Sequence, residues 1–292
     1  MANKKIMMGL SLCTVLCLTG CRTKNVSAES RSESNIVIVE TAAVSDKMSA
    51  VDAEAAIAAV ETSDGRERKM AAGPKIENLD ELAAGTVIPQ EDIEGGELDD
   101  YFVSYPIDDA LFDRIYGLSY KEDCTIPLEE LRYLKVLHYG YDQQIYVGEL
   151  MVNAGLAEDF LEIFKVLYEN QYEIEKMLLV DDFGADDNWS IENNNTSAFN
   201  YRVSTLDGVT LSNHAYGCAI DINPLQNPYV TYYDWGMDTY FDVSVPYMDR
   251  EDMSLEHMID HEDLCYQLFI DHGFTWGGDW ENPKDYQHFE KR

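Results

Sequence analysis

The chain has 292 residues, of which 21 are Lys or Arg and 55 are Asp or Glu, giving a formal net charge of −34. A surface this acidic repels phosphate backbones and anionic lipid headgroups, so the composition argues against nucleic-acid binding. Because 46% of the residues are hydrophobic and 11% are aromatic, the chain can bury a sizeable core, which excludes disorder throughout. The length allows one large domain or two ordinary ones.

The first residues are typical of an export signal. Lys4 and Lys5 precede an apolar run from Ile6 to Leu18 that is too short to span a bilayer comfortably. The run closes in Leu-Thr-Gly-Cys21, a bacterial lipobox pattern in which the cysteine thiol accepts the lipid. Residues 1–21 are therefore predicted to be a lipoprotein signal peptide, with Cys21 as the lipidation site. The expected location is extracytoplasmic and lipid-anchored to the bacterial membrane; an ordinary secretory signal is the alternative.

The next segment has the composition of a linker. Residues 22–99 are rich in Ala, Ser, Glu, Asp and Thr and contain no aromatic residue before Tyr101. We interpret this segment as a flexible acidic tether, because few of its residues are able to anchor a core. Every Trp, Tyr and Phe lies beyond it, so residues 100–292 are predicted to form the folded domain.

The folded domain shows both helical and strand-like patterns. The first half is predicted to contain a helix after Pro127, with Leu128, Leu131, Leu134 and Leu137 at helical spacing, an amphipathic helix over Phe160–Tyr168, and a buried strand at Met177–Val180. The second half is predicted to contain a hairpin or turn over Val203–Leu211 around Asp207-Gly208, a strand at Ala219–Ile222, and a helix at Leu264–His272 that Gly273 ends. This order of elements indicates an α+β domain, with a small antiparallel sheet and flanking helices.

Cysteine usage limits the cross-links within this domain. Cys124, Cys218 and Cys265 are an odd number, so at most one disulfide can form among them. The chain has no CxxC pair, which argues against a zinc ribbon or thioredoxin-like chemistry.

The segment from Ser212 to Asp221 carries the first candidate chemistry. An Asp on an otherwise apolar strand is costly unless it is paired or binds a metal, and Asp221 ends the apolar stretch Cys-Ala-Ile. Gly217 would let the backbone turn so that His214 folds back toward Asp221. A loop histidine beside a hydrogen-bonded aspartate is the alternative.

A second segment, near the C-terminus, contains a possible third metal ligand and a further carboxylate. His288 offers a third ligand, and Asp285 offers a free carboxylate three residues earlier. Catalytic zinc sites use three protein ligands with a fourth position open for water, and a neighbouring carboxylate can accept the proton of that water. An extended chain would put Asp285 and His288 on different faces, whereas a turn between them would let both converge.

These two segments together resemble a known family. The pattern Ser212-x-His214-x-x-Gly217-x-Ala219-x-Asp221, followed by Asp285-x-x-His288, is similar to the signature of the zinc D-alanyl-D-alanine carboxypeptidases and L-alanyl-D-glutamate endopeptidases, which have the hedgehog/D,D-peptidase fold. The resemblance extends through Asn195–Arg202, Asn223–Tyr229 and Trp276-Gly-Gly, and covers roughly Tyr101 to Lys291.

The resemblance implies roles for individual residues. His214, Asp221 and His288 would bind one Zn²⁺, and Asp285 would be the catalytic acid/base. Arg202 matches the family's arginine and would steady the scissile carbonyl oxygen or a substrate carboxylate. The interval of twelve residues from Arg202 to His214 is shorter than in the vancomycin-resistance carboxypeptidases. Candidate substrate-binding residues are Ser212, which lies within the motif, and Trp280.

A competing metal site and several competing functions remain open. His257 and His261 are four apart, as in helical zinc-protease motifs, but the glutamate that should follow the first histidine is missing. The leading prediction is a zinc-dependent peptidase that cleaves peptidoglycan stem peptides at the cell surface, as carboxypeptidase or endopeptidase. The alternatives are a non-catalytic module of the same fold that binds wall peptide or a protein, and a zinc enzyme acting on another amide.

Overall fold

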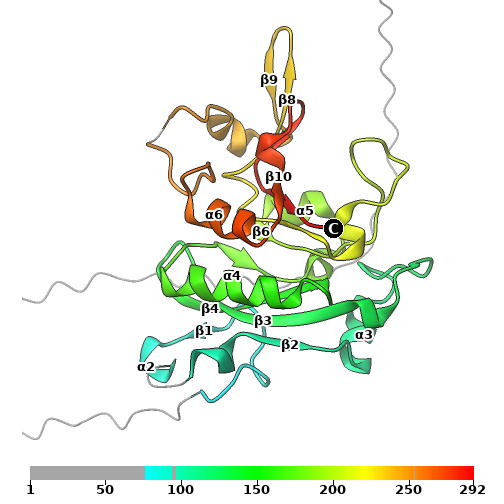
Figure 1. The fold of residues 1–292 in the computed structure, drawn as a ribbon, viewed down its shortest axis with the longest axis vertical. Coiled ribbons are helices and arrows are strands. Elements are labelled where there is room, and N and C mark those ends of the chain that lie inside the picture. The colour runs from blue at the N-terminus through cyan, green and yellow to red at the C-terminus, as the bar shows by residue number, and fades with distance from the viewer. Residues whose placement is uncertain (1–75, 94–96, 253) are drawn as a thin grey trace, which may run out of the picture. The chain divides into compact units, whose positions relative to one another are not determined.

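The computed structural model describes residues 76–93, 97–252 and 254–292 (Figure 1). The predicted signal peptide, Cys21 and the tether up to residue 75 lie outside these residues. The described segments all fall within one unit of the chain, Lys69–Arg292. None of their helices is long and apolar enough to cross a membrane.

The last part of the predicted tether belongs to the fold. Strand β1 (Val87–Ile88) pairs with a long strand of the main sheet, and helix α2 (Gln90–Ile93) follows it. Leu79 is 0% exposed and Ile88 is 2% exposed, so both lie in the core. The tether boundary at residue 99 is therefore too late, because a few aliphatic side chains anchor this segment without any aromatic residue.

A buried lysine of the main sheet also binds the segment around residue 80. Lys135 donates to the backbone carbonyls of Leu79, Asp80 and Leu82, at Nζ–O distances of 2.9, 3.0 and 2.7 Å. An ammonium group has three donors, and here all three are used. The segment around residue 80 is therefore fixed to the sheet by charge-assisted hydrogen bonds as well as by apolar contact.

The main sheet has four antiparallel strands in the order β1-β4-β3-β2. Its members are β1, β2 (Val103–Tyr105), β3 (Leu131–Tyr139) and β4 (Ile145–Asn153). The helix predicted after Pro127 is wrong, since a short 3₁₀ turn (Leu128–Glu130) leads directly into β3. Residues 134–139 are buried on both faces of the sheet, so the strand has no polar alternation. Its leucines at every third position then imitate the helical period.

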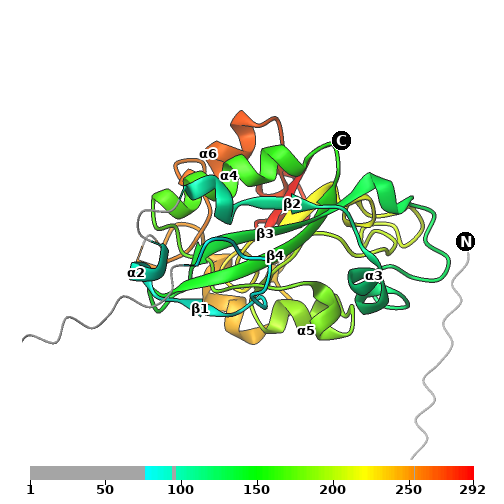
Figure 2. The ribbon, with the colours of Figure 1, turned by 90° about the horizontal axis from the view of Figure 1, so that it is seen from below.

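One face of this sheet is covered by the predicted amphipathic helix, which is confirmed as α4 (Ala157–Glu169) (Figures 1 and 2). Phe160, Ile163, Phe164 and Leu167 of α4 are buried in the core. Helix α6 (Leu264–Asp271) packs against α4 and is also confirmed. Gly273 follows it with a φ of 82°, a conformation that glycine adopts at little cost.

Shorter elements connect the main sheet to the C-terminal part. They include helices α3 (Asp109–Ile115) and α5 (Asp187–Glu192), parallel strands β5 (Lys176–Met177) and β6 (Asn195–Thr196), and 3₁₀ turns at Leu98–Tyr101, Val180–Phe183, Asn213–Tyr216, Asp242–Met248 and Gly277–Asp279. The strand predicted over Met177–Val180 is thus confirmed only at its first residue. The predicted turn around Asp207-Gly208 is confirmed, with Val203 bridged to Leu211.

Two small antiparallel sheets form the C-terminal part. The first has the order β10-β12-β7, with β10 (Thr275–Trp276), β12 (His288–Glu290) and β7 (Ala219–Asp221). The second has the order β11-β8-β9, with β11 (Lys284–Asp285), β8 (Tyr229–Tyr233) and β9 (Gly236–Asp238). The described residues thus combine helices with small, mainly antiparallel sheets, as the predicted α+β class requires.

Candidate metal centre

The first candidate ligand is placed by a tight turn. His214 lies in the 3₁₀ turn Asn213–Tyr216, and the Ser212 hydroxyl accepts a hydrogen bond from the His214 backbone N–H at 3.3 Å. Gly217 ends the turn with a φ of 66°, and a Cβ there would lie 2.5 Å from the Asn153 nitrogen. The glycine therefore allows both the left-handed turn and the close approach to β4, and it points His214 back toward β7.

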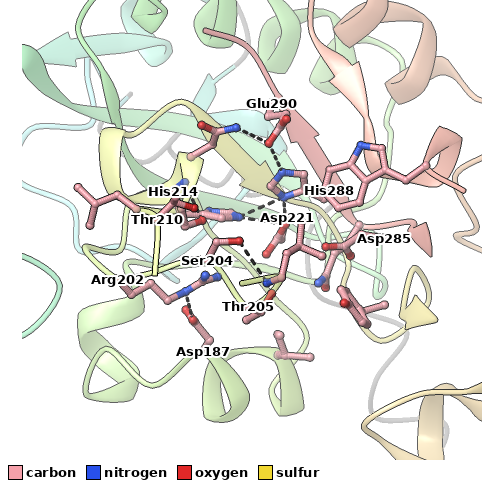
Figure 3. Close-up of a pocket in the computed structure, with 18 of the residues that line it drawn as sticks. Asp187, Arg202, Ser204, Thr205, Thr210, His214, Asp221, Asp285, His288 and Glu290 are labelled. Atoms are coloured by element: carbon pink, nitrogen blue, oxygen red, sulfur yellow. Dashed lines mark hydrogen bonds and ion pairs between the residues drawn. The ribbon is translucent and has the colours of Figure 1, made fainter. Parts of the chain in front are cut away.

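The other two candidate ligands face each other across two strands. Asp221 at the end of β7 is directly opposite His288 at the start of β12, so their side chains share one face of the sheet. Figure 3 shows both side chains converging with His214. The distances are 3.0 Å from His288 Nδ1 to Asp221 Oδ1, 3.3 Å from His214 Nε2 to Asp221 Oδ1, and 3.2 Å between the two histidine nitrogens.

This triangle has the size that a zinc ion requires. With metal–ligand bonds of about 2.0–2.1 Å, neighbouring atoms of a tetrahedron lie about 3.3 Å apart. The three ligand atoms match one triangular face of such a tetrahedron, which leaves the fourth corner open. Within the part of the chain that the structure describes, this is the one group of His, Cys, Asp or Glu side chains whose ligand atoms lie close enough together to hold a metal ion.

Outer hydrogen bonds fix which ring nitrogen of each histidine faces this centre. His214 donates from Nδ1 to the Ala198 carbonyl at 2.6 Å, which leaves Nε2 free for a metal. His288 donates from Nε2 to a Glu290 oxygen at 2.9 Å, which leaves Nδ1 free. Glu290 also accepts a hydrogen bond from the Asn213 side chain. Such outer partners set the tautomer and orientation of metal-binding histidines, so the donor set fits a zinc ion.

The buried charges of the centre stabilise one another. Burial raises the pKa of Asp221, but the positive charge of His214 and the hydrogen bonds from both histidines hold it well below its usual range. Burial lowers the pKa of His288, but hydrogen bonds to Asp221 and Glu290 outweigh this effect and raise it to about 10. The centre is thus an anionic cradle that favours a bound cation, whether a proton or a metal.

Asp285 reaches the same pocket from the second small sheet. The chain leaves β11 at Asp285 and enters β12 at His288, so a change of sheet between them lets both side chains converge. Gly277 makes room for this crossing, since a Cβ there would lie 2.5 Å from the Asp285 carbonyl oxygen.

The Asp285 carboxyl is buried without a complete set of partners. The residue is 9% exposed, and its Oδ1 has no hydrogen-bond partner among the described residues. Burial, followed by the negative charge of Asp221, raises the pKa of Asp285 to about 7. A carboxyl with these properties is able both to accept and to return a proton near neutral pH.

A pocket of about 570 Å³ surrounds these groups. Arg202 lines it and forms an ion pair with Asp187 at the start of α5 (Figure 3). Ser212 and Trp280 also line the pocket, and the Trp280 ring centroid lies 5.3 Å from that of His288. All the predicted site residues of the folded domain therefore border one cavity; their roles in catalysis and binding stay predictions.

The competing histidines lie elsewhere. His257 stacks on Tyr141 at a centroid distance of 3.8 Å, and His261 Nε2 lies 2.7 Å from Asp279. Neither belongs to the group of three candidate ligands. Cys124, Cys218 and Cys265 are free thiols, and Trp276 is buried in the core.

Sequence reasoning missed several groups that build the pocket. Asp187, which pairs with Arg202, lies fifteen residues upstream and has no motif around it. Glu290 lies two residues after a candidate ligand, on the same strand face, and this spacing was the one signal that could have identified it as an outer partner. The carbonyl of Ala198 carries no side-chain signal at all.

Comparison with known proteins supports the C-terminal part of this picture. Residues 207–291 match the model of a family described as D-alanyl-D-alanine carboxypeptidase. The match contains His214, Asp221, Asp285 and His288, and it ends before the last residue of the chain. Neither the curated proteins nor the solved structures yielded a match to this chain.

Proposed function

Because residues 207–291 match the D-alanyl-D-alanine carboxypeptidase family, which confirms the resemblance found in the sequence, we propose that this protein is a zinc-dependent peptidase acting on D-Ala-D-Ala-containing peptides of peptidoglycan. The observation that carries the proposal is the triangle of His214, Asp221 and His288 ligand atoms beside the unpartnered carboxyl of Asp285. The hedgehog/D,D-peptidase fold is part of the same proposal.

Each group has a distinct part in the proposed reaction. A bound Zn²⁺ would polarise the scissile carbonyl and lower the pKa of a coordinated water. Asp285 accepts at Oδ1 the proton of the attacking water and then delivers it to the leaving amine. Glu290 and the Ala198 carbonyl keep the imidazoles of His288 and His214 in the required tautomers.

The cationic side of the pocket is supplied by Arg202. Its guanidinium is held by Asp187 and lines the cavity, so it is in place to stabilise negative charge on the carbonyl oxygen or to hold a substrate carboxylate. Trp280 forms an apolar wall beside His288. Residues 1–21 and Cys21 would place the enzyme outside the membrane on a lipid anchor, where peptidoglycan is available.

The test is digestion of purified peptidoglycan fragments that carry pentapeptide stems, followed by mass spectrometry of the products. Zinc-loaded protein should release one terminal alanine per stem, and Asp285→Asn should not. Cleavage inside the stem would instead assign endopeptidase action. Binding of the fragments without any cleavage would contradict the proposal and favour a non-catalytic module of the same fold.

A further inference from the structure

The sheet that carries Asp285 continues beyond the pocket as a projecting hairpin. Asp285 on β11 is directly opposite Tyr229 on β8, so the two side chains share one face of this sheet. Thr231 and Tyr233 follow on the same face, because side chains alternate along a strand. Strands β8 and β9 form a hairpin that extends away from the neighbouring elements (Figure 1). The face of the sheet that carries Asp285 therefore continues along the β8–β9 hairpin.

Exposed aromatic rings follow this face. At the pocket, the ring centroids of Tyr229 and Tyr240 are 5.6 Å apart. Farther out, Tyr233 and Trp235 stack almost in parallel, with centroids 4.8 Å apart and an interplanar angle of 7°. Trp235 is 73% exposed and Tyr240 is 70% exposed, although rings of this size are usually covered. We call these four residues the aromatic strip.

A carboxylate lies between the two aromatic pairs. Asp238 on β9 is directly opposite Thr231, so its side chain also projects from the face of the aromatic strip. Its Oδ1 accepts a hydrogen bond from the Thr239 backbone at 3.0 Å. No other hydrogen bond or ion pair to the Asp238 side chain occurs in the part of the chain that the structure describes, which leaves its outer oxygen available.

The three strands β11, β8 and β9 place no Lys or Arg side chain on this face. Lys284, the cation in these three strands, is opposite Val230 and so projects from the other face. Its ammonium group donates to the Gly278 carbonyl at 2.7 Å. Between residues 229 and 249 the sequence contains no Lys or Arg. An anionic ligand or an anionic bilayer would therefore be repelled, whereas a cation would meet both a carboxylate and electron-rich ring faces.

The pocket at the base of the hairpin contains two buried oxygen atoms that lack hydrogen-bond partners among the described residues. Asp285 Oδ1 and Gln287 Oε1 are buried, line the pocket and have no hydrogen-bond partner among the described residues. Gln287 is 5% exposed. Because these two acceptors lie at the pocket wall, a ligand that enters the pocket can satisfy them by donating hydrogen bonds, as the N–H groups of a peptide do.

From these observations we propose that the aromatic strip and Asp238 form a subsite for a positively charged amino group on the peptide substrate. This inference rests on the proposed function and narrows its substrate class to stems that carry a free primary amine near the cleaved bond. The ammonium group would lie against the exposed rings and pair with the Asp238 carboxylate.

The spacing suits a lysine-like residue. Thr231 is two residues along β8 from Tyr229, which places Asp238 about 7 Å beyond the level of Asp285 at 3.3 Å per residue. One residue of extended peptide plus an extended lysine side chain spans roughly 10 Å. An amine on the residue that precedes the terminal D-Ala-D-Ala therefore reaches this subsite.

Two synthetic peptides test the proposal. Nα-acetyl-L-Lys-D-Ala-D-Ala carries a free ε-amine, and Nα,Nε-diacetyl-L-Lys-D-Ala-D-Ala is its neutral counterpart. For the wild-type, zinc-loaded protein we expect kcat/KM to be about 10-fold higher for the free amine, mainly through KM, and this ratio should fall as salt is added. Asp238→Asn should bring the ratio close to one, and Trp235→Ala should reduce it. Asp271→Asn, the same change at an exposed site on α6, should leave it unchanged.

Failure of this inference can be told apart from failure of the proposed function. If the wild type hydrolyses both peptides equally well, the subsite is wrong while the peptidase proposal stands. A preference for the free amine that survives Asp238→Asn also overturns the subsite. If neither peptide is hydrolysed, calorimetric binding decides: tighter binding of the free amine that Asp238→Asn abolishes supports the subsite, and equal or undetectable binding overturns it.

Discussion

The main sheet and the pocket of the candidate metal centre each bury a carboxylate, but only the carboxylate in the sheet has partners for both its oxygens. In the sheet, Glu149 is 1% exposed and both its oxygens are occupied, by Arg114 at 2.5 and 2.8 Å, by the Tyr133 hydroxyl at 2.6 Å and by the Leu179 N–H at 3.3 Å. In the pocket beside the candidate metal centre, Asp285 Oδ1 is buried and has no hydrogen-bond partner among the described residues.

The difference separates charge that serves the fold from charge that serves a ligand. A buried acceptor with no partner costs about 1–3 kcal/mol, and in the pocket a bound ligand or the reaction could offset that cost. The sheet shows no such cost at Glu149 or Lys135, since each uses its hydrogen-bonding capacity within the protein. Substitutions in the two regions should therefore affect different quantities.

The largest effect is expected at Asp285. Asp285→Asn should reduce kcat by about 10²–10⁴-fold, because the amide cannot accept the proton of the attacking water. Zinc content should stay near one per chain, since the three ligand side chains are unchanged. Kinetics on a D-Ala-D-Ala peptide and metal analysis of the same sample provide the check, and near-normal turnover by the zinc-loaded variant would show that another group is the base.

Breaking the satisfied cluster in the sheet should instead lower stability. Glu149→Ala removes the partner of Arg114, Tyr133 and the Leu179 N–H, and it should lower the free energy of unfolding by about 3–5 kcal/mol. Asp182→Ala is the matched control, because this more exposed carboxylate pairs with the same arginine and should cost no more than about 1 kcal/mol. Urea titration measures both, and equal losses would contradict the distinction between the two regions.

The sheet also contains a pH-sensitive group that does not line the pocket of the candidate metal centre. Burial lowers the pKa of His138 on β3 to about 4, below the value of about 6.5 in an unfolded chain. The unfolded state therefore binds this proton first, so stability is lost as the pH falls from about 6.5 to about 4, by up to about 3 kcal/mol.

His138→Asn should remove that part of the pH dependence. The amide still offers a donor for the Ile174 carbonyl, which His138 Nδ1 contacts at 2.9 Å, and it does not titrate. We expect the difference between the free energies of unfolding of the two proteins to become smaller as the pH falls from 8 to 4. Parallel curves would show that His138 does not control acid stability.

A smaller effect is expected at Glu290, which is a hydrogen-bond partner of the candidate ligand His288. Glu290→Gln weakens the acceptor that orients His288, and such outer substitutions typically cost about 10–100-fold in metal affinity. Competition with a zinc chelator measures the change. Glu281→Gln, an exposed change in the loop before β11, serves as the control, and an equal shift in both variants would remove the proposed orienting role of Glu290.

The sequence identified the candidate ligands because their chemistry lies in short local patterns. His214, Gly217 and Asp221 lie on a turn and a strand, whereas Asp285 and His288 lie three residues apart on β11 and β12, which belong to different sheets. What brings the two segments together is the pairing of β7 with β12, and strand pairing between distant segments has no local signal.

The errors in the fold have the same physical origin. Strand β3 was predicted as a helix because tertiary burial on both faces removes the alternation by which a strand is recognised. The tether was extended to residue 99 because Leu79 and Ile88 have no aromatic neighbours, although the sheet and Lys135 hold them in place. In both cases the deciding contacts come from residues far away in the chain.

We propose that His214, Asp221 and His288 together hold one zinc ion. Metal analysis of purified wild type, His288→Ala and His261→Ala, after dialysis against a weak chelator, tests it most directly. We expect about one zinc per chain in wild type and in His261→Ala, and little in His288→Ala, because removing one of three protein ligands leaves the ion weakly held. Equal zinc in all three proteins, or loss confined to His261→Ala, would contradict it.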